Sequence, residues 1–410
     1  MNRTILHCDC NSFYASVETL LDPTLADGPS AVCGDPESRH GIILAKNEKA
    51  KAFGVQTAET IWQARRKCPD LRLVAPHRSE YVKYSRRCNE LYLQYTDLVD
   101  PFGIDESFLD VTGSIHLFGT GEQIADELRR RMREEVGLTI SVGVSFNRAF
   151  AKLGSDYKKP DATTVFSPEN YKEKVWPLPV NTLLYVGKRA AGRLSHLGVH
   201  TIGDLAACDP AFVHSVFGKM GDTLLRYARG EDDEPVRSFY AEREVKSVGN
   251  SMTFAHNLIG EEACRLGLTA LCDNVGRRLR ARGLVCQTVQ LGIRDPDFHN
   301  RSRQVTLDRP TNSTRTLIET TTALLRANWQ MDKPVRLLSV TAAGLLPEEQ
   351  SCEQLSLFES ADALAQRERQ RKLDQTVDAL RQRFGDQSVI FAHSVQKNRE
   401  KSKNEKSKPG

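Results

Sequence analysis

The sequence predicts an α+β protein built from several domains. Its 410 residues exceed the roughly 100–200 residues of one typical domain. Two regions mix short apolar strand-like runs with amphipathic helical patterns, and a purely helical region separates them. The apolar content of 40% and the charged content of 27% are normal for a globular protein with a sizeable core.

The first mixed region covers about 165 residues. RTILHCDC (3–10) is typical of a short buried strand, and FYASVETLL (13–21) places its apolar residues on one helical face. We expect further helices at 79–97 and 121–136, and a hairpin in LVDPFGIDESFLDVTG. Additional strands are predicted in SAVCG, GIILAKN and LTISVGVSF.

The rest of the chain divides by pattern. Residues 168–235 are helical with short Gly-marked turns, and the charged stretch at 230–247, which contains Pro235, is a candidate linker. Residues 248–345 follow a β–α–β–β–α–β order. After 346 the chain turns polar, and a last helical pattern ends at Gly385 before a basic, disordered end.

Charge and cysteine content indicate the setting. The net charge is only +4, but residues 397–410 hold six Lys/Arg against two Glu, and residues 247–345 hold thirteen against eight. Local basic regions favour a polyanionic partner, although a solubilising tail is an equal alternative for the end. We see no transmembrane helix or signal peptide, and ten cysteines without a C-x-x-C fit buried thiols in the cytoplasm.

The stretch HCDC (7–10) contains four potential metal ligands in a row, which raises the possibility of a zinc or redox site. Asp9 ends a predicted strand, and the pair Asp105/Glu106 lies in a predicted hairpin, about 96 residues away. Buried carboxylates are costly unless they are paired or bind metal, and Mg²⁺ prefers such oxygen ligands. A solvated or salt-bridged pair is the alternative for Asp105/Glu106 taken alone.

Four segments in order carry a family resemblance: Asp9 followed by FYASVE, then AKAFGV, then IDESFLDV, then SVGVSFNRAFAKLGSDYKKPD. Together they resemble the Y-family DNA polymerases, above all bacterial DNA polymerase IV and the UmuC-related translesion enzymes. The resemblance runs over about the first 350 residues. It implies a right-hand architecture with a palm (1–11 and 80–167), fingers (12–79), a helix-hairpin-helix thumb (168–235), a linker (236–246) and a little finger (247–346) of β-α-β-β-α-β order, followed by a tail (347–410).

The resemblance also implies an active site. Asp9, Asp105 and Glu106 match the family's carboxylates for two Mg²⁺ ions, and the backbone carbonyl of Cys10 would complete one shell. His7 and Cys8 are then ordinary strand residues, one on each face.

The nucleotide contacts follow from the same segments. Tyr14 matches the steric gate that excludes a ribose 2′-hydroxyl, and Phe13 either supports it as a nucleotide contact or faces the core. Lys51 and Lys159 match cations for the dNTP phosphates. The chain departs from the family where Glu48 and Lys51 replace a usual Tyr–x–x–Arg pair.

Basic and glycine-rich segments imply contacts with primer–template DNA. In the thumb, the helix-hairpin-helix turns offer backbone N–H groups to phosphates, with an ordinary helix turn as the alternative. In the little finger, the segments RRLRARG (277–283) and RSR (301–303) would lie over the backbone of the duplex. The candidate residues are Gly187, Lys188, Gly218, Lys219, Gly221, Arg277, Arg278, Arg280, Arg301 and Arg303.

EQLSLFES in the tail matches the bacterial sliding-clamp motif at 354–358, with anchors Gln354, Leu355, Leu357 and Phe358. Together with this motif, the resemblance implies a monomeric, cytoplasmic, nucleoid-associated translesion DNA polymerase of low fidelity that the β clamp recruits. The alternatives are a non-catalytic DNA-binding adaptor of the same fold and a palm-fold nucleotidyl cyclase. The complete carboxylate set disfavours the first, and the helical thumb disfavours the second.

Overall fold

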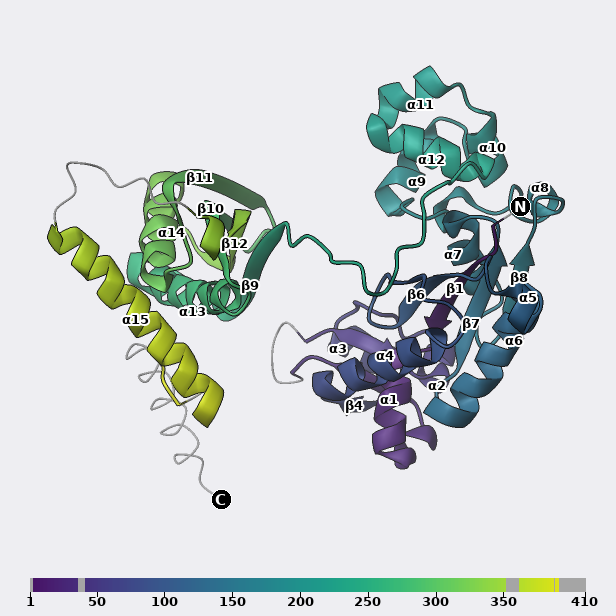
Figure 1. The fold of residues 1–410 in the computed structure, drawn as a ribbon, viewed down its shortest axis with the longest axis horizontal. Helices are drawn as coiled ribbons and strands as arrows, with labels where there is room; N and C mark the ends of the chain where they lie inside the picture. The colour runs from purple at the N-terminus through teal and green to yellow at the C-terminus, as the bar shows by residue number, and fades with distance from the viewer. Residues whose placement is uncertain (1–2, 36–40, 352–360, 387, 391–410) are drawn as a thin grey trace. The chain divides into compact units, whose positions relative to one another are not determined.

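The computed structural model describes residues 3–35, 41–351, 361–386 and 388–390. The chain divides into two compact units, residues 1–242 and 243–410, which we describe one at a time (Figure 1). Within the described ranges, none of the helices combines the length and the apolar character needed to cross a membrane.

A five-stranded sheet forms the centre of the first unit. Its strands in spatial order are β5 (Val99–Pro101), β6 (Glu106–Asp110), β1 (Ile5–Cys10), β7 (Ile140–Ser145) and β8 (Thr163–Phe166). The middle strand β1 is antiparallel to both neighbours, and all of its residues are buried. A strand covered on both faces can be apolar throughout, which explains the run ILHC without a polar alternation.

Helices cover both faces of this sheet. Leu6, Cys8 and Cys10 belong to a core shared with α4 (Arg78–Tyr92) and α6 (Gly121–Arg131). Ile5, His7 and Asp9 face the opposite helix α7 (Arg148–Tyr157). The predicted separation of His7 and Cys8 onto two faces is therefore what the structure contains.

Helix α7 lies unusually close to the sheet because glycines face each other across the contact. A Cβ atom on Gly143 of β7 would lie only 1.9 Å from the carbonyl oxygen of Ala151, and one on Gly154 would lie 2.9 Å from the Cα atom of Gly143. Side chains of α7 consequently reach the end of β1.

A second, three-stranded sheet follows β1 in the chain, in the order β3-β2-β4. Its elements are β2 (Ser30–Cys33), β3 (Ile43–Lys46) and β4 (Arg72–Val74), with α2 (Glu48–Ala52) and α3 (Ile61–Lys67) beside them. Helix α1 (Phe13–Leu21) begins directly after β1 and packs against β2 and β3, so it links the two sheets.

A helical subdomain completes the first unit, and its apolar core also includes Phe150 of α7 and Phe166 of β8. It contains α9 (Lys188–His196), α10 (Ile202–Ala207), α11 (Pro210–Phe217) and α12 (Lys219–Arg229), preceded by the short α8 (Tyr171–Lys174). The extended segment after α12 still packs on the five-stranded sheet. Val236 is buried there with Ile5, and the Phe239 N–H donates to the Asp97 carbonyl oxygen.

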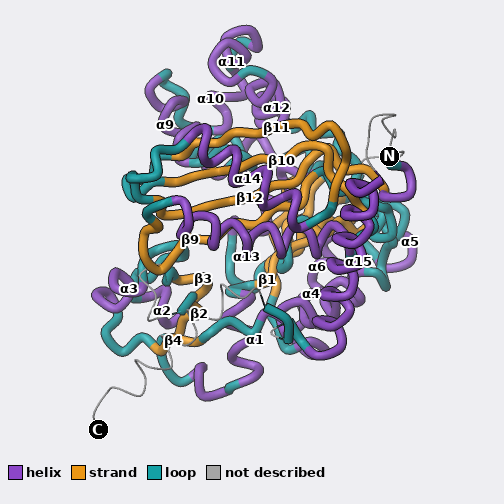
Figure 2. The backbone as a smooth tube through the Cα atoms, turned by 90° about the vertical axis from the view of Figure 1, so that its left-hand side faces the viewer, coloured by secondary structure: helices purple, strands orange, loops and turns teal. Residues whose placement is uncertain are grey.

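The second unit is a four-stranded antiparallel sheet in the order β11-β10-β12-β9, with two helices across one face (Figure 2). In chain order the elements are β9 (Ser247–Leu258), α13 (Glu261–Arg280), β10 (Leu284–Arg294), β11 (Asn300–Thr311), α14 (Thr314–Asn328) and β12 (Val335–Pro347). This is the predicted β–α–β–β–α–β order. Alternate residues such as Leu291 and Val340 form the core with the helices.

A last helix, α15 (Ala361–Phe384), is held against α13 by ion pairs. Arg381, whose side chain is 7% exposed, donates to both carboxylate oxygens of Asp273, at 3.0 and 2.8 Å. Arg280 of α13 pairs with Asp374 and Asp378 of α15. Because most of these charged groups are sheltered from water, the ion pairs fix the position of α15 against α13.

We predict that Arg381→Ala loosens α15, because it leaves the Asp273 carboxylate without this partner in a sheltered position. Hydrogen–deuterium exchange of the α15 amides in the full chain should accelerate by about 10-fold or more. Arg383→Ala, an exposed change on the same helix, is the matched control. Equal exchange rates of the α15 amides in the two variants would show that the Arg381–Asp273 ion pair does not hold this helix in place.

Candidate active site

Three carboxylates separated along the chain meet at one end of β1 and β6. Asp9 is directly opposite Glu106 in the antiparallel register of the two strands. Asp105 precedes β6, and its carbonyl oxygen accepts a hydrogen bond of 2.9 Å from the Cys10 N–H. The strand pairing therefore brings together the three acidic residues that the sequence singled out.

The pKa values of Asp105 and Glu106 are shifted in opposite directions by their surroundings. Burial, followed by the negative charges of Asp9 and Glu106, raises the pKa of Asp105 to about 6. Burial also acts upward on Glu106, but the contacts with His7 and Lys152 outweigh it and lower its pKa to about 2. Glu106 thus remains ionised near neutral pH, whereas burial and the neighbouring carboxylates destabilise the ionised form of Asp105.

Two lysines neutralise the site. The Lys152 ammonium of α7 lies 3.1 Å from Asp9 Oδ2 and 2.6 Å from Glu106 Oε2. The Lys159 ammonium lies 2.8 Å from the same Asp9 oxygen and 2.7 Å from Asp156 Oδ1. Sequence reasoning named Lys159 but missed Lys152. The available signal was a lysine among the apolar residues of α7, where a solvated side chain is unusual.

His7 lies beneath the carboxylates and is fully buried. Its Nδ1 is 2.8 Å from Ser155 Oγ, and its Nε2 is 3.4 Å from Glu106 Oε2, too long for a strong hydrogen bond. Burial, the largest effect, lowers the pKa of His7, so the imidazole is neutral near pH 7.

The geometry disfavours a zinc site in HCDC. Atoms of His7, Asp9 and Glu106 lie within 4.8 Å of one another, but Cys8 and Cys10 lie in the core on the other face. The side chains that converge are mainly carboxylates, and hard cations such as Mg²⁺ prefer oxygen ligands. The residues present therefore fit Mg²⁺ better than a thiol-bound metal.

An aromatic pair begins α1, immediately beyond the carboxylates. Phe13 is buried in the main core, with 3% of its surface exposed, which supports its packing role and corrects the expectation of a nucleotide contact. Tyr14 is half-buried, and its ring is stacked on Tyr81 of α4, with centroids 4.2 Å apart and planes inclined by 16°.

The α2 helix lies near this pair. The Ser12 hydroxyl donates to Glu48 Oε1 at 3.4 Å, and the exposed Lys51 ammonium lies 3.3 Å from Glu48 Oε2. Lys51 is therefore on an element next to the start of α1, and its side chain is about half exposed.

The glycines expected to contact DNA differ in their surroundings. Gly187 precedes α9, and Gly218, with φ of +60°, precedes α12, so the exposed Lys188 and Lys219 each begin a helix. Gly221 is buried, and a Cβ there would lie 2.6 Å from the Val213 carbonyl oxygen. Close packing of α11 and α12 explains this glycine, so we withdraw it as a DNA contact.

The arginines of α13 are engaged within the second unit. Arg280 is sheltered and paired with α15, so it is not available for the predicted DNA contact. Arg277 pairs with Asp386, and Arg278 donates to the Gly249 carbonyl oxygen at 2.7 Å. Local arginine density indicated a basic surface, but the partners of these side chains lie elsewhere in the chain.

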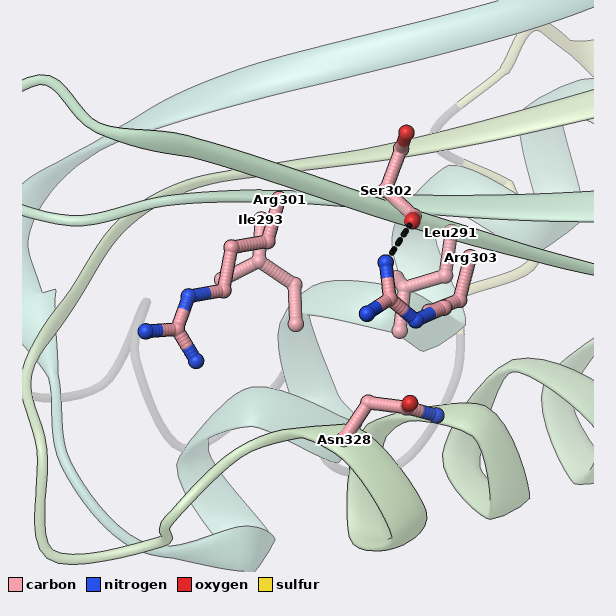
Figure 3. A pocket seen from close by; sticks show the side chains of 6 residues that line it. All are labelled: Leu291, Ile293, Arg301, Ser302, Arg303 and Asn328. Atoms are coloured by element: carbon pink, nitrogen blue, oxygen red, sulfur yellow. Dashed lines mark hydrogen bonds between the residues drawn. The ribbon is translucent and has the colours of Figure 1, made fainter.

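Arg301 and Arg303 project toward the helix-covered side of the sheet. They stand opposite Ile293 and Leu291, which are core residues, and they line a small hollow with Asn328 (Figure 3). The guanidinium of Arg301 lies 5.5 Å from the centroid of the Trp329 ring. Ser302 between them points the other way, to the open face.

The open face of this sheet is mostly small and neutral. Strand alternation places on it Ser251, Ser339, Thr341, Gln290, Gly292, Ser302 and Gln304, and at one end Arg294, which donates to Asn300. The clamp anchors Gln354, Leu355, Leu357 and Phe358 lie outside the described residues.

Comparisons with known proteins identify the family of this chain. Residues 8–156 match the impB/mucB/samB family, and residues 245–357 match its C-terminal domain. DNA polymerase IV of Acetivibrio thermocellus is 46% identical over 95% of this chain and 96% of the relative. DNA polymerase IV 1 of Bacillus subtilis is 34% identical over 98% of this chain and 95% of the relative.

A solved structure has the same fold. A Y-family DNA polymerase chimera superposes with a TM-score of 0.75, over 84% of this chain and 99% of that one, at 22% sequence identity. With the family matches and the extent of the identity to DNA polymerase IV sequences, it follows that the chain belongs to the Y-family DNA polymerases, as a member of the impB/mucB/samB family.

Proposed function

We propose that this DNA-directed DNA polymerase of the translesion type extends a primer by phosphoryl transfer with two Mg²⁺ ions held at Asp9, Asp105 and Glu106. The single observation that carries the proposal is the meeting of Asp9 with the pair Asp105/Glu106, which begins 96 residues later in the chain, at one end of two neighbouring strands.

The chemistry of the donors supports a divalent cation. Asp105 is held at a raised pKa by two neighbouring negative charges, and a cation between these oxygens would remove that cost. When bound, such a pair of ions supplies charge that activates the primer 3′-hydroxyl and stabilises the leaving pyrophosphate. The Cys10 carbonyl would add another oxygen at the same end of β1.

The cationic side chains have a role in substrate binding. Lys159 and Lys51 are the proposed partners of the triphosphate, because an ammonium is a suitable point charge for phosphate oxygens. The Lys159 ammonium pairs with Asp9 and Asp156, which places this cation beside the carboxylates of the proposed metal site. Lys152 contacts both Asp9 and Glu106, and we propose that it keeps these carboxylates close together.

We propose that Tyr14 lies under the sugar of the incoming nucleotide and rejects a 2′-hydroxyl. Its position at the start of α1, directly after the strand that carries Asp9, supports this role.

The family names of the domains apply as proposals. The five-stranded sheet would be the palm, the three-stranded sheet the fingers, the α9–α12 subdomain the thumb, and the second unit the little finger. For DNA, the helix starts at Gly187 and Gly218 offer N–H groups to phosphates, and the neutral open face of the second sheet suits contacts that do not depend on base sequence.

Recruitment by the β sliding clamp rests on the sequence QLSLF (354–358) alone. Spaced leucines and a Leu–Phe pair in a polar tail are typical of a peptide that inserts into a partner's apolar pocket. The alternative named from the sequence, a non-catalytic adaptor of the same fold, is disfavoured by the polymerase relatives and by the paired carboxylates and lysines of the site.

We predict that Asp105→Asn stabilises the metal-free protein at pH 8 by about 1–2 kcal/mol. Each pKa unit corresponds to about 1.4 kcal/mol, and partial exposure reduces the full effect. Because the folded pKa of about 6 lies above the ordinary value of 3.8, the ionised carboxylate destabilises the fold above pH 6. The gain should therefore shrink as the pH falls through 6 toward 4.

Urea unfolding in EDTA at pH 8 and pH 5 measures this gain. Asp70→Asn, at an exposed site of the same unit, serves as the control. A gain of the same size at both pH values would show that ionisation of Asp105 is not its cause.

We predict that Asp105→Asn and Glu106→Gln each lower primer extension with Mg²⁺ by more than about 100-fold, since even residues behind metal ligands often cost 10–100-fold. The control is Asp295→Asn, in the other acidic cluster of the described chain, with Asp297 and His299. Extension at the unaltered rate by either active-site variant would remove that residue from the metal site.

We predict that the combined change Gln354→Ala, Leu357→Ala and Phe358→Ala abolishes stimulation of primer extension by the β clamp, because it removes the anchors that fill the pocket. Basal extension without clamp should stay unchanged. Ser356→Ala, between the anchors, is the matched control. Persisting stimulation in the triple variant would assign recruitment to another contact.

A further inference from the structure

The ring of Tyr14 packs against two other aromatic rings, those of Tyr81 and Phe13. Its half-buried ring is stacked face to face on the ring of Tyr81, which is only 1% exposed. Phe13 flanks both rings, with centroid distances of 5.7 Å to Tyr14 and 6.2 Å to Tyr81. The depth at which the Tyr14 ring can sit is therefore limited from below by Tyr81.

Tyr81 is itself held at its hydroxyl. This hydroxyl donates to Glu18 Oε1 and accepts from the His77 N–H at 3.2 Å. A hydroxyl held by both a donor and an acceptor leaves the ring little freedom to rotate or withdraw. Burial, followed by the contact with Glu18, raises the pKa of Tyr81, so the hydroxyl remains a donor throughout the physiological pH range.

Glu18 is a buried carboxylate that is hydrogen-bonded by His77 and Tyr81. It is 2% exposed and lies one helical turn after Tyr14 on α1. Besides the Tyr81 hydroxyl, it contacts the His77 N–H at 3.1 Å and the His77 Nδ1 at 2.9 Å. Burying a carboxylate is costly unless its oxygens are satisfied, and here these donors satisfy it.

The arrangement connects two elements. Glu18 shares α1 with Tyr14, whereas Tyr81 belongs to α4 and His77 precedes that helix. The stacked rings and the Tyr81–Glu18 hydrogen bond join the two helices at two points one turn apart. A motion of the Tyr14 ring toward the core must therefore displace a ring that is fixed at its far end.

We propose that Tyr81, held by Glu18, is a positioning residue that sets the depth of the Tyr14 ring and thereby the rejection of ribonucleotides. The inference rests on the proposed role of Tyr14 as the sugar contact. If the support is removed, the Tyr14 ring sinks into the space of the lost ring, and a 2′-hydroxyl fits above it.

The test compares single-nucleotide insertion of dCTP and CTP opposite template G, as the ratio of the two kcat/KM values. Tyr81→Leu should lower this ratio by about 3- to 10-fold, the range that an aromatic pair supports. Tyr81→Phe, which keeps the stack and loses the hydroxyl, should lower it by about 2-fold. Tyr84→Leu, on the same helix, should leave the ratio unchanged.

The ratio of the kcat/KM values for dCTP and CTP distinguishes a positioning role of Tyr81 from a role in folding alone. A merely structural Tyr81 would lower insertion of both nucleotides together and leave the ratio intact, which would overturn the inference. Tyr81→Phe retains the ring and its packing, so it provides a measurement even if Tyr81→Leu folds poorly.

The double variant Tyr14→Ala/Tyr81→Leu separates this inference from the proposed gate. If Tyr81 acts through Tyr14, the double variant should match Tyr14→Ala alone. Effects that multiply would overturn the inference. A ratio changed by Tyr14→Ala but not by Tyr81→Leu would support Tyr14 as the steric gate and reject only the positioning role of Tyr81. A ratio unchanged in both would reject the gate and the support together.

Discussion

The antiparallel pairing of β1 with β6 is the constraint on which the active site depends. It sets Asp9 opposite Glu106, and it leaves Asp105 at the strand's beginning, where the Cys10 N–H binds its carbonyl oxygen. A register shift of one residue would send these side chains to opposite faces of the sheet. The burial of every β1 residue makes such a shift costly, so the core that stabilises the fold also holds the carboxylates together.

The charge balance follows from the same geometry. Three carboxylates at one strand end repel one another, and the contact of α7 with β7 through Gly143 and Gly154 brings Lys152 within reach. Lys152 and Lys159 thus offset part of the negative charge of these carboxylates. Behind it, a neutral His7 and a protonated Tyr81 occupy buried positions without adding charge.

Much of this arrangement was predictable from the sequence. The β–α–β–β–α–β order followed from clean alternation. Asp9, Asp105 and Glu106 followed from the resemblance of their segments to the Y-family polymerases, since an acidic pair in a strand is weak evidence by itself. Lys152 was not predicted, because its place among the apolar residues of α7 indicates burial but does not identify the distant carboxylates that it contacts. The same reason explains the arginines: nothing local to RRLRARG reveals that Arg280 binds Asp374 and Asp378, about a hundred residues later. Tyr81 was missed because its partners, Tyr14 and Glu18, lie more than 60 residues away.

The segment between the two units is short once its contacts are taken into account. Val236 and Phe239 are still bound to the first unit, and β9 of the second begins at Ser247. Only a few residues therefore act as a tether. A short tether keeps each unit at a local concentration on the order of millimolar relative to the other. If each unit contacts the same duplex, as proposed above, rebinding by one unit while the other stays bound is an intramolecular event.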